Sequence, residues 1–464
     1  MKLSLSDIAQ SVGGRLVGSD VTIEGVSTDT RTITPKALFV ALKGERYDAH
    51  DFVVTAHDRG ATAALVEREV DAHVPQIVVT DSLLALGELA RTVRAGRDAR
   101  VVGITGSNGK TTVKTLTAAI LTRHGRTHVN AGNLNNEIGV PLTLLSMPES
   151  TQYAVIEMGA GKPGDIAYLA RIARPDIGLV NNVAPAHLER LGSERGVAET
   201  KGAIYAWLPP DGTAIINADD AYAGYFAELA SPRRIVRFGL EARADVTAEL
   251  DVRNGFTLKT PAGTTPVTLG QPGRHNVMNA LAAASIAFAL DVPLATIRAG
   301  LEAAPAVAGR LARRKHASGA VLIDDSYNAN PGSFAAAIAT LANEPGQTIL
   351  VMGDMAELGA DAERLHAHIG ALAKASGIQH LHAVGRLSRA AIDAFGSGAT
   401  HHADQAALIS ALRSELRAGV TALIKGSRSS AMDRVVSALI DDGNVAQALT
   451  VQASAAVDAG DDLQ

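Results

Sequence analysis

The sequence predicts an α/β protein with three domains: a small N-terminal α/β domain, a central P-loop-type domain with a doubly wound, mostly parallel sheet, and a C-terminal Rossmann-like α/β domain. Two observations lead to this prediction. Apolar strand patterns alternate with helical patterns along most of the chain, which favours parallel sheets covered by helices. The chain of 464 residues is also long enough for about three domains of ordinary size.

The composition excludes several classes of function. A formal net charge of −5 argues against a surface that binds nucleic acid. The absence of cysteine removes disulfides, thiolate zinc sites and cysteine nucleophiles. The N-terminus has no signal-peptide pattern, and no apolar run reaches the roughly 18 residues of a membrane span. We therefore expect a cytoplasmic protein with no nucleic-acid partner and no membrane insertion.

The first domain is expected to contain a helix over residues 3–12 and strands over residues 20–26 and 37–43. A polar loop follows each strand, at residues 27–31 and 44–51. Ligands often bind beyond the carboxyl ends of strands in α/β sheets. The same residue types are common in ordinary turns, so the residues alone leave both interpretations open.

A glycine-rich loop follows the first strand of the central domain, in the segment 101–112. Its glycines run G-x-x-G-x-x-G-K-T-T, and Ile104 stands where the standard phosphate-loop pattern has its first glycine. Loop N–H groups and the start of the next helix would face the phosphates, Lys110 would reach the β- and γ-phosphates, and the Thr111 hydroxyl would be available to Mg²⁺. The pattern predicts binding of an ATP-type nucleotide by Gly106, Ser107, Asn108, Gly109, Lys110, Thr111 and Thr112.

The remaining elements follow the strand–helix rhythm, with one interruption. In the central domain we expect strands at 153–159 and 176–183, helices at 165–173, 193–207 and 273–290, and a small antiparallel insertion at 245–269. In the C-terminal domain we expect strands at 320–324, 348–352, 381–384 and 421–424, helices at 362–375 and 404–416, and a frayed end after about residue 441.

Three side chains of the central domain are candidates for metal binding. Glu157 ends a buried strand, which is where a carboxylate holds Mg²⁺ beside a bound triphosphate, or where a charge simply marks the exit into solvent. His187 follows the next strand, although a single histidine is more often a surface residue. Lys201 lies in a helical pattern, and the residues alone do not distinguish a functional lysine from a solvated one.

Two polar segments are further candidates. Asn133, Asn135 and Asn136 lie close together and are either turn residues or amide donors to phosphate or acyl oxygens. The segment 324–331 (DDSYNANP) follows a strand and precedes a helix. Its carboxylates would bind ribose or metal, or its polar side chains would cap the helix that begins near Ser333.

Taken together, these motifs resemble the Mur ligases, the ATP-dependent amide ligases that build the peptidoglycan peptide. The resemblance rests on residues 105–112 (TGSNGKTT), 157–159 (EMG), His187, Lys201, 275–279 (HNVMN), 309–310 (GR) and 325–328 (DSYN), in this order. Further segments resemble the family member that adds a dipeptide, namely 27–31, 44–51, 136–141, 325–331, 353–359 and 425–429.

The resemblance implies an activity and its participants. The enzyme would use ATP and Mg²⁺ to join D-alanyl-D-alanine to UDP-N-acetylmuramoyl-tripeptide through an acyl phosphate, as a cytoplasmic monomer of peptidoglycan synthesis. It also implies domain limits: residues 1–97 would bind the uridine nucleotide, 98–308 ATP and 309–452 the dipeptide, with 453–464 as a flexible tail. Two alternatives remain, a folylpolyglutamate synthase-like ligase and a regulatory ATPase.

The resemblance also implies roles for individual residues. Lys110, His187, Lys201 and Asn136 would be catalytic. Thr111 and Glu157 would hold one Mg²⁺, and His187 with a carbamylated Lys201 a second. Asn279 would contact adenine, Arg310 the phosphates and Asp325 the ribose. The substrates would contact Ser27, Asp29, Arg31, Asp48 and His50 in the first domain, and Asn328, Asn330, Glu357, Lys425 and Arg428 in the third.

Overall fold

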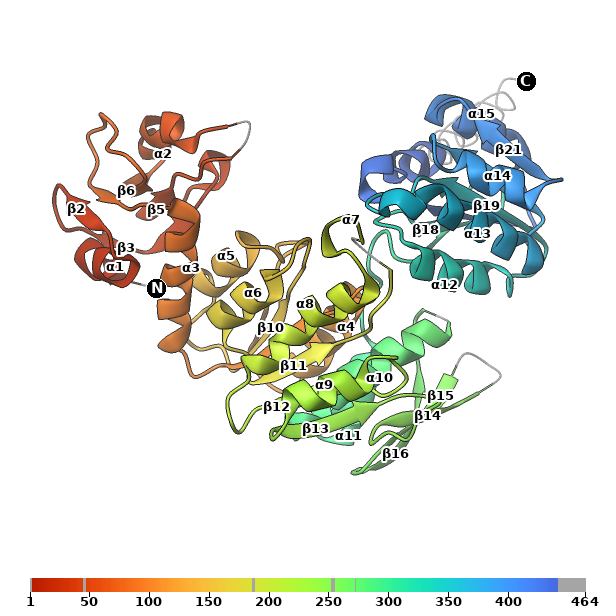
Figure 1. Cartoon of the computed structure of the whole chain (residues 1–464), viewed down its shortest axis with the longest axis horizontal. Coiled ribbons are helices and arrows are strands. Elements are labelled where there is room, and N and C mark those ends of the chain that lie inside the picture. Colours follow the sequence, from red (N-terminus) through yellow and green to blue (C-terminus); the bar gives the residue numbers. More distant parts are fainter. Residues whose placement is uncertain (1, 45–46, 186–187, 252–254, 272, 441–464) are drawn as a thin grey trace, which may run out of the picture. The chain divides into compact units, whose positions relative to one another are not determined.

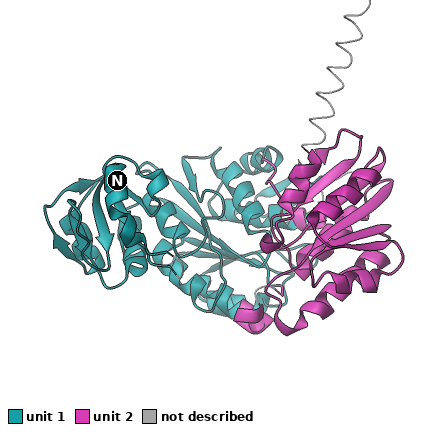
Figure 2. Cartoon of the chain, turned by 90° about the horizontal axis from the view of Figure 1, so that it is seen from above, with its two compact units in different colours: residues 1–183, 198–268, 278–304 teal, residues 184–197, 269–277, 305–464 magenta. Residues whose placement is uncertain are grey.

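The structure is a computed structural model, and it describes residues 2–44, 47–185, 188–251, 255–271 and 273–440 (Figure 1). The chain forms two compact units (Figure 2). The first unit contains residues 1–183, 198–268 and 278–304, and the second contains 184–197, 269–277 and the described residues from 305 onward. The predicted α/β class is confirmed, with a separate sheet in each of the three predicted regions.

The first region contains a five-stranded sheet in the order β2-β7-β6-β5-β4, parallel except for the β2–β7 pair. Its strands are β2 (Arg15–Val17), β4 (Gly25–Ser27), β5 (Ala37–Val40), β6 (Ala61–Val66) and β7 (Gln76–Val78). Its helices are α1 (Leu5–Val12), α2 (Val53–Asp58) and α3 (Ser82–Ala95), with short 3-10 helices at Thr30–Thr32 and Ala49–Phe52.

The single strand expected over residues 20–26 is wrong, because the chain changes partners at Glu24. The strand β3 (Thr22–Ile23) pairs with β1 (Leu3–Ser4), whereas β4 belongs to the main sheet. Between them, the backbone N–H of Glu24 donates to the carbonyl of Lys36. A local apolar pattern cannot show such a change of partner.

The central sheet has six strands in the order β13-β12-β11-β8-β10-β9, all parallel. The strands are β8 (Arg100–Thr105), β9 (Thr127–Val129), β10 (Tyr153–Glu157), β11 (Ile177–Val180), β12 (Thr213–Asn217) and β13 (Arg234–Phe238). The helices are α4 (Lys110–Leu121), α5 (Gly139–Leu145), α6 (Asp165–Ala173), α7 (Leu188–Leu191), α8 (Glu194–Ala206) and α9 (Ala223–Ala230). Because β8 lies between β10 and β11, the order of strands reverses beside it, and such a switch point is where open α/β sheets bind ligands.

The antiparallel insertion and the alanine-rich helix are confirmed. The insertion forms a three-stranded sheet of β14 (Thr247–Leu250), β15 (Gly255–Thr260) and β16 (Gly263–Thr268). The helices α10 (Arg274–Ala289) and α11 (Leu294–Glu302) follow it.

The C-terminal sheet has the order β17-β18-β22-β19-β20-β21, parallel except for the edge strand β17. Its strands are β17 (Ala312–Lys315), β18 (Val321–Asp325), β19 (Gln347–Gly353), β20 (His380–Val384), β21 (Ala399–His402) and β22 (Val420–Lys425). Its helices are α12 (Pro331–Leu341), α13 (Ala362–Ala375), α14 (Arg389–Phe395) and α15 (Gln405–Glu415). The sequence did not predict the two edge strands or α14. The expected frayed end lies outside the described residues.

Candidate active site

The glycine-rich loop joins β8 to α4 at the reversal point of the central sheet. Gly109 caps the helix with a φ of 78°, a left-handed conformation that suits glycine. A Cβ at this position would lie 2.3 Å from the Oδ1 of Asn279, so the close approach also requires glycine. The Nζ of Lys110 donates to the carbonyl of Gly106 over 2.8 Å, which places the amine against the loop. The geometry matches the phosphate loop that the sequence predicts.

Two asparagines at the end of β11 hold this loop, and the sequence analysis did not identify them. The backbone of Ser107 donates to the Asn182 carbonyl over 2.9 Å, and the backbone of Asn108 donates to the Asn182 Oδ1 over 2.8 Å. The Asn181 amide donates to the Asn108 carbonyl over 2.9 Å and to the Asn279 Oδ1 over 3.0 Å. The signal available in the sequence was a pair of amides directly after a fully apolar strand.

Glu157 ends β10, directly beside the end of β8, and only 2% of its surface is exposed. The Asn135 amide donates to its Oε1 over 2.8 Å, and the Nζ of Lys114 lies 3.2 Å from its Oε2. Its backbone N–H donates to the Asn130 side chain over 2.7 Å. The carboxylate is thus held at the edge of the sheet that carries the phosphate loop.

The structure separates the asparagines of the 133–136 cluster. Asn135 contacts Glu157, whereas Asn136 is exposed and accepts from the backbone N–H groups of Ile138 and Gly139, at the start of α5. Asn133 is also exposed. A catalytic role for Asn136 stays a prediction, and the residue that lies against the predicted metal ligand is its neighbour.

Lys201 lies in α8 with 1% of its surface exposed, so the solvated helix face that the residues alone allowed is not observed. Burial, followed by the nearby charge of Lys110, holds the pKa of the Lys201 amine well below its ordinary value. A buried lysine of this kind favours the neutral amine. The predicted ligand His187 lies outside the described residues.

The chemistry of the donors fits Mg²⁺. Thr111 and Glu157 offer a hydroxyl and a carboxylate, and Mg²⁺ is usually bound by one or two carboxylates together with substrate phosphates. In the part of the chain that the structure describes, no cluster of three His, Asp or Glu side chains provides an all-protein site. A shared site between the chain and a bound nucleotide is the arrangement that these donors favour.

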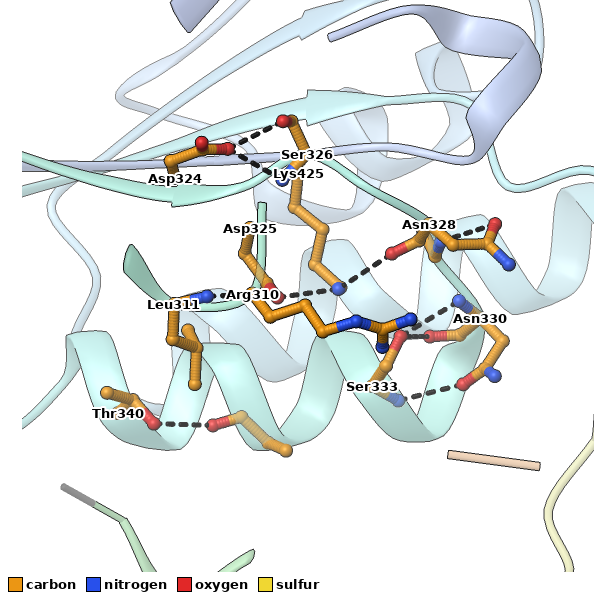
Figure 3. Close-up of polar contacts among 12 residues, drawn as sticks. Arg310, Leu311, Asp324, Asp325, Ser326, Asn328, Asn330, Ser333, Thr340 and Lys425 are labelled. Atoms are coloured by element: carbon orange, nitrogen blue, oxygen red, sulfur yellow. Dashed lines mark hydrogen bonds and ion pairs between the residues drawn. The ribbon is translucent and has the colours of Figure 1, made fainter. Parts of the chain in front are cut away.

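In the second unit, Asp325 and Lys425 end neighbouring strands and form a buried ion pair (Figure 3). The Nζ of Lys425 lies 2.6 Å from the Oδ2 of Asp325 and donates to the Asn328 carbonyl over 3.0 Å. The other carboxylate oxygen of Asp325 accepts from the backbone N–H of Leu311 over 3.2 Å. The Arg310 side chain points toward the start of α12 (Figure 3), and its guanidinium stacks 4.4 Å above the Tyr327 ring centre.

The remaining predicted residues of this unit differ in exposure. Asn330 caps α12, because its Oδ1 accepts from the Ser333 backbone over 2.8 Å, which agrees with the capping interpretation. The Arg428 side chain is 68% exposed and lies 3.1 Å from Asp433. Glu357 has a φ of 61° in the loop after β19. Of the two cationic side chains predicted to bind the dipeptide, Arg428 is therefore exposed to solvent, whereas Lys425 is buried.

In the first region, the two predicted loops are organised by their own carboxylates. The Arg31 side chain hydrogen-bonds Asp29, which lowers the pKa of that carboxyl to about 2. Ser27 also accepts from the Asp29 backbone over 3.1 Å. His50 is buried, with its Nδ1 2.5 Å from Asp48 and its Nε2 accepting from the Glu67 backbone over 2.7 Å. Because both ring nitrogens of His50 are engaged, this histidine shapes the loop from inside.

Three family models match the chain, in the order of the three predicted domains. They are "Mur ligase family, catalytic domain" at residues 22–94, "Mur ligase middle domain" at 104–287, and "Mur ligase, glutamate ligase domain" at 309–428. The UDP-N-acetylmuramoyl-tripeptide–D-alanyl-D-alanine ligase of Escherichia coli is 48% identical over 450 residues, covering 96% of this chain and 99% of that protein. The chain belongs to the Mur ligase family.

Solved structures of this family have the same fold as the chain. A crystal structure of MurF from Acinetobacter baumannii matches with a TM-score of 0.90 and 35% identity, covering 95% of this chain and 99% of that one. MurF from Thermotoga maritima, solved in complex with ADP, matches with a TM-score of 0.82 and 27% identity, covering 91% and 98%. Among the described residues of this Mur ligase, no helix has the length and apolar character needed to cross a membrane.

Proposed function

We propose that this Mur ligase uses ATP to join D-alanyl-D-alanine to UDP-N-acetylmuramoyl-tripeptide, in the synthesis of peptidoglycan precursors. The observation that carries the proposal is the 48% identity to the E. coli ligase of that name over nearly the whole of both chains. The match includes the N-terminal region, which we propose binds the uridine nucleotide. A folate-modifying ligase has no uridine nucleotide to bind and would not need this region. The phosphate-loop geometry supports the use of ATP.

The reaction divides an unfavourable condensation into two steps. The γ-phosphoryl group of ATP passes to the terminal carboxylate of the tripeptide, giving an acyl phosphate and ADP. The amino group of D-alanyl-D-alanine then attacks the acyl carbon, the new amide forms and phosphate leaves. Both reactants of the first step are anionic, so the site must supply positive charge and fixed donors. We propose that Lys110 and the N–H groups at the start of α4 serve this purpose at the β- and γ-phosphates.

Thr111 and Glu157 would hold Mg²⁺ beside the phosphates, and the bound ion would supply further positive charge to the transferring group. The contacts of Asn135 and Lys114 orient the Glu157 carboxylate. We propose that Lys201, as a carbamate, and His187 serve a second ion. The low pKa of Lys201 supports this role, because only a neutral amine adds carbon dioxide.

The second unit would contribute the other substrate contacts. We propose that Arg310 binds phosphate, that Asp325 binds the ribose, and that the exposed Arg428 pairs with the dipeptide carboxylate. The first domain, residues 1–97, would bind the uridine nucleotide, residues 98–308 ATP, and residues 309–452 the dipeptide. All these residues belong to one chain, and we propose that the enzyme is a monomer. We also propose that it acts in the cytoplasm, where ATP is available.

A phosphate-release assay tests the function. Purified enzyme is given ATP, Mg²⁺ and a UDP-N-acetylmuramoyl-tripeptide, with and without D-alanyl-D-alanine, and the product is identified by mass spectrometry. We expect one amide for each phosphate, and release that depends on both substrates. Equal phosphate release without either substrate would instead indicate a regulatory ATPase. Parallel assays with tripeptides that end in diaminopimelate or lysine determine which acceptor is used.

A further inference from the structure

A second lysine lies on the helix that follows the phosphate loop. Lys114 is four residues after Lys110 in α4, and positions four apart lie on the same side of a helix. Its side chain is 7% exposed and its Nζ lies 3.2 Å from the Oε2 of Glu157. The same amine donates to the carbonyls of Asn130 and Gly132 over 3.3 and 3.0 Å. Lys110 contacts the loop, whereas Lys114 contacts the carboxylate.

The segment 130–135 connects these two charged groups a second time. The Asn130 side chain accepts from the Glu157 backbone N–H over 2.7 Å and donates to the Glu157 carbonyl over 3.2 Å. The Asn135 side-chain amide donates to the Glu157 Oε1, and the Asn135 backbone carbonyl accepts from the Gly159 N–H over 2.7 Å. The carboxylate, the lysine and this segment therefore form one hydrogen-bonded cluster, and a change at Lys114 alters the environment of Glu157.

We propose that Lys114 is a positioning residue that acts as the resident counter-cation of Glu157, so that a divalent cation must compete with the Lys114 amine for this carboxylate. Both side chains are nearly excluded from water, so little solvent screens their interaction. Without the Lys114 charge, the Glu157 carboxylate would attract divalent cations more strongly, even without nucleotide. With Lys114 in place, the ion binds well only when the phosphates of ATP add their own oxygens. This inference rests on the proposed Mg²⁺ site at Glu157.

A purely structural role makes a different prediction. If Lys114 only ties the segment 130–135 to α4, its loss lowers stability equally with and without divalent cation. If Lys114 is the counter-cation, its loss leaves a carboxylate that Mg²⁺ or Mn²⁺ stabilises. The response of the nucleotide-free protein to the cation therefore separates the two roles, without any measurement of turnover.

The experiment measures Mn²⁺ binding by electron paramagnetic resonance and melting temperature with and without Mg²⁺, on the full chain without nucleotide. Lys114→Met is the main variant, and Lys114→Gln, which still donates to carbonyls, is the second in case the first does not fold. We expect either neutral variant to bind Mn²⁺ about ten-fold or more tightly than wild type, since a neighbouring positive charge has been removed. We also expect Mg²⁺ to raise its melting temperature more than that of wild type.

Arg94→Met is the matched control. Arg94 is another buried cation of the same unit, 3.4 Å from Asp176, and Asp176 accepts from the backbone of Val101 at the opposite end of β8. This variant should lose stability but gain no response to Mg²⁺. Adding Glu157→Gln to Lys114→Met should abolish the gain, because the carboxylate itself has been removed.

The outcomes distinguish this inference from the proposed function. Unchanged Mn²⁺ affinity in both Lys114 variants, with loss of ATP-dependent Mn²⁺ binding in Glu157→Gln, would overturn the counter-cation role and leave the metal site intact. Unchanged Mn²⁺ binding in Glu157→Gln with ATP present would overturn the metal site itself. Lys114→Arg keeps the charge and should retain the affinity of wild type.

Discussion

The Nζ of Lys425 lies 2.6 Å from the Oδ2 of Asp325, and the two side chains are only 3% and 12% exposed. The two residues are direct neighbours at the ends of the parallel strands β22 and β18. The amine has a second acceptor in the Asn328 carbonyl. The positive charge of Lys425 therefore fixes the loop after β18 and the Asp325 carboxylate, which we propose binds the ribose.

This pair gives a prediction about stability. Lys425→Met should lower the free energy of unfolding by about 3–5 kcal/mol, because it leaves a buried carboxylate without its cation. Urea unfolding followed by circular dichroism measures this loss. Adding Asp325→Asn to Lys425→Met should restore part of it. A double variant whose loss equals the sum of the two single losses would contradict the coupling.

An exposed pair for comparison is Arg298 and Glu302 on α11, whose side chains are 45% and 31% exposed. Solvent screens such a pair, so Arg298→Met should cost less than about 1 kcal/mol.

The exposed Arg428 gives a prediction about the dipeptide. Arg428→Ala should raise the KM for D-alanyl-D-alanine about ten-fold or more, because a pairing cation for its carboxylate is lost. The KM for ATP should change little. The exposed Arg434, a few residues further on, provides the control as Arg434→Ala. An unchanged dipeptide KM in Arg428→Ala would remove Arg428 from the substrate site.

The phosphate loop gives two related variants. Lys110→Ala should reduce kcat by about a hundred-fold or more, as removal of a transition-state donor does, while the fold stays intact. Gly109→Ala should lose nucleotide affinity as well as stability, because its Cβ would collide with Asn279 and Asn181. Isothermal titration with ADP and melting curves separate these effects. Activity of Lys110→Ala close to wild type would show that Lys110 is not the phosphate lysine.

The C-terminal sheet gives a prediction about pH. The Nδ1 of His382 lies 2.9 Å from the Nε2 of His402, and its Nε2 lies 3.2 Å from Glu415. Burial is the main cause that lowers the pKa of both histidines, and Glu415 opposes it at both. His380 adds to the lowering of the pKa of His382, and His382 and His401 add to the lowering of the pKa of His402.

The lowered pKa values determine how stability depends on pH. Because the pKa values of these histidines are lower in the folded chain, the unfolded chain binds protons more readily. The free energy of unfolding should therefore be highest above the ordinary histidine pKa of about 6.5 and should decrease as the pH falls below it. The decrease should be on the order of 1 kcal/mol for each unit by which a pKa is lowered. Urea unfolding at pH 7.5 and 5.5 measures it, and His402→Gln should reduce the difference. Equal pH dependence in wild type and His402→Gln would contradict this account.

The sequence indicates candidate site residues where their chemistry lies in a continuous segment. The phosphate loop and Glu157 were predicted because each follows a recognisable strand pattern. Asn181, Asn182 and Lys114 were not identified, since their roles depend on which strands are neighbours. Nothing in the local pattern shows that β8 lies between β10 and β11, and only this order brings the end of β11 against the loop.

Side-chain burial was the other property that the sequence did not show. His50 was predicted to contact substrate, and the structure shows it buried, with its Nδ1 against Asp48 of its own loop and its Nε2 accepting from the Glu67 backbone just after β6. Lys201 was equally compatible with a solvated surface, yet it is buried in a helix whose neighbours are fixed only by the tertiary fold. An amino-acid pattern indicates which faces of a helix are apolar, whereas the burial of a single polar side chain depends on how the helix packs.

Burial of the Lys201 amine lowers the stability of the folded chain, and replacement of this side chain should show by how much. The pKa of the Lys201 amine is lowered chiefly by burial, so the unfolded chain binds a proton that the folded chain does not favour. Stability should therefore rise as the pH increases toward the ordinary lysine pKa of about 10.4. Lys201→Met should be more stable than wild type at neutral pH and should lose this pH dependence. Melting curves at pH 7 and 9 without ligands test the prediction.

Substitution of Lys201 should also remove activity, because we propose that its carbamate is a ligand of the second Mg²⁺. A cationic lysine would repel Mg²⁺, whereas the neutral amine adds carbon dioxide, releases a proton and presents two carbamate oxygens as hard ligands. Lys201→Ala should be nearly inactive and partly rescued by acetate, which supplies a carboxylate in the space left by the side chain. Lys201→Arg should not be rescued, since its charge persists. Normal turnover of Lys201→Ala without acetate would show that the buried lysine is structural and not a metal ligand.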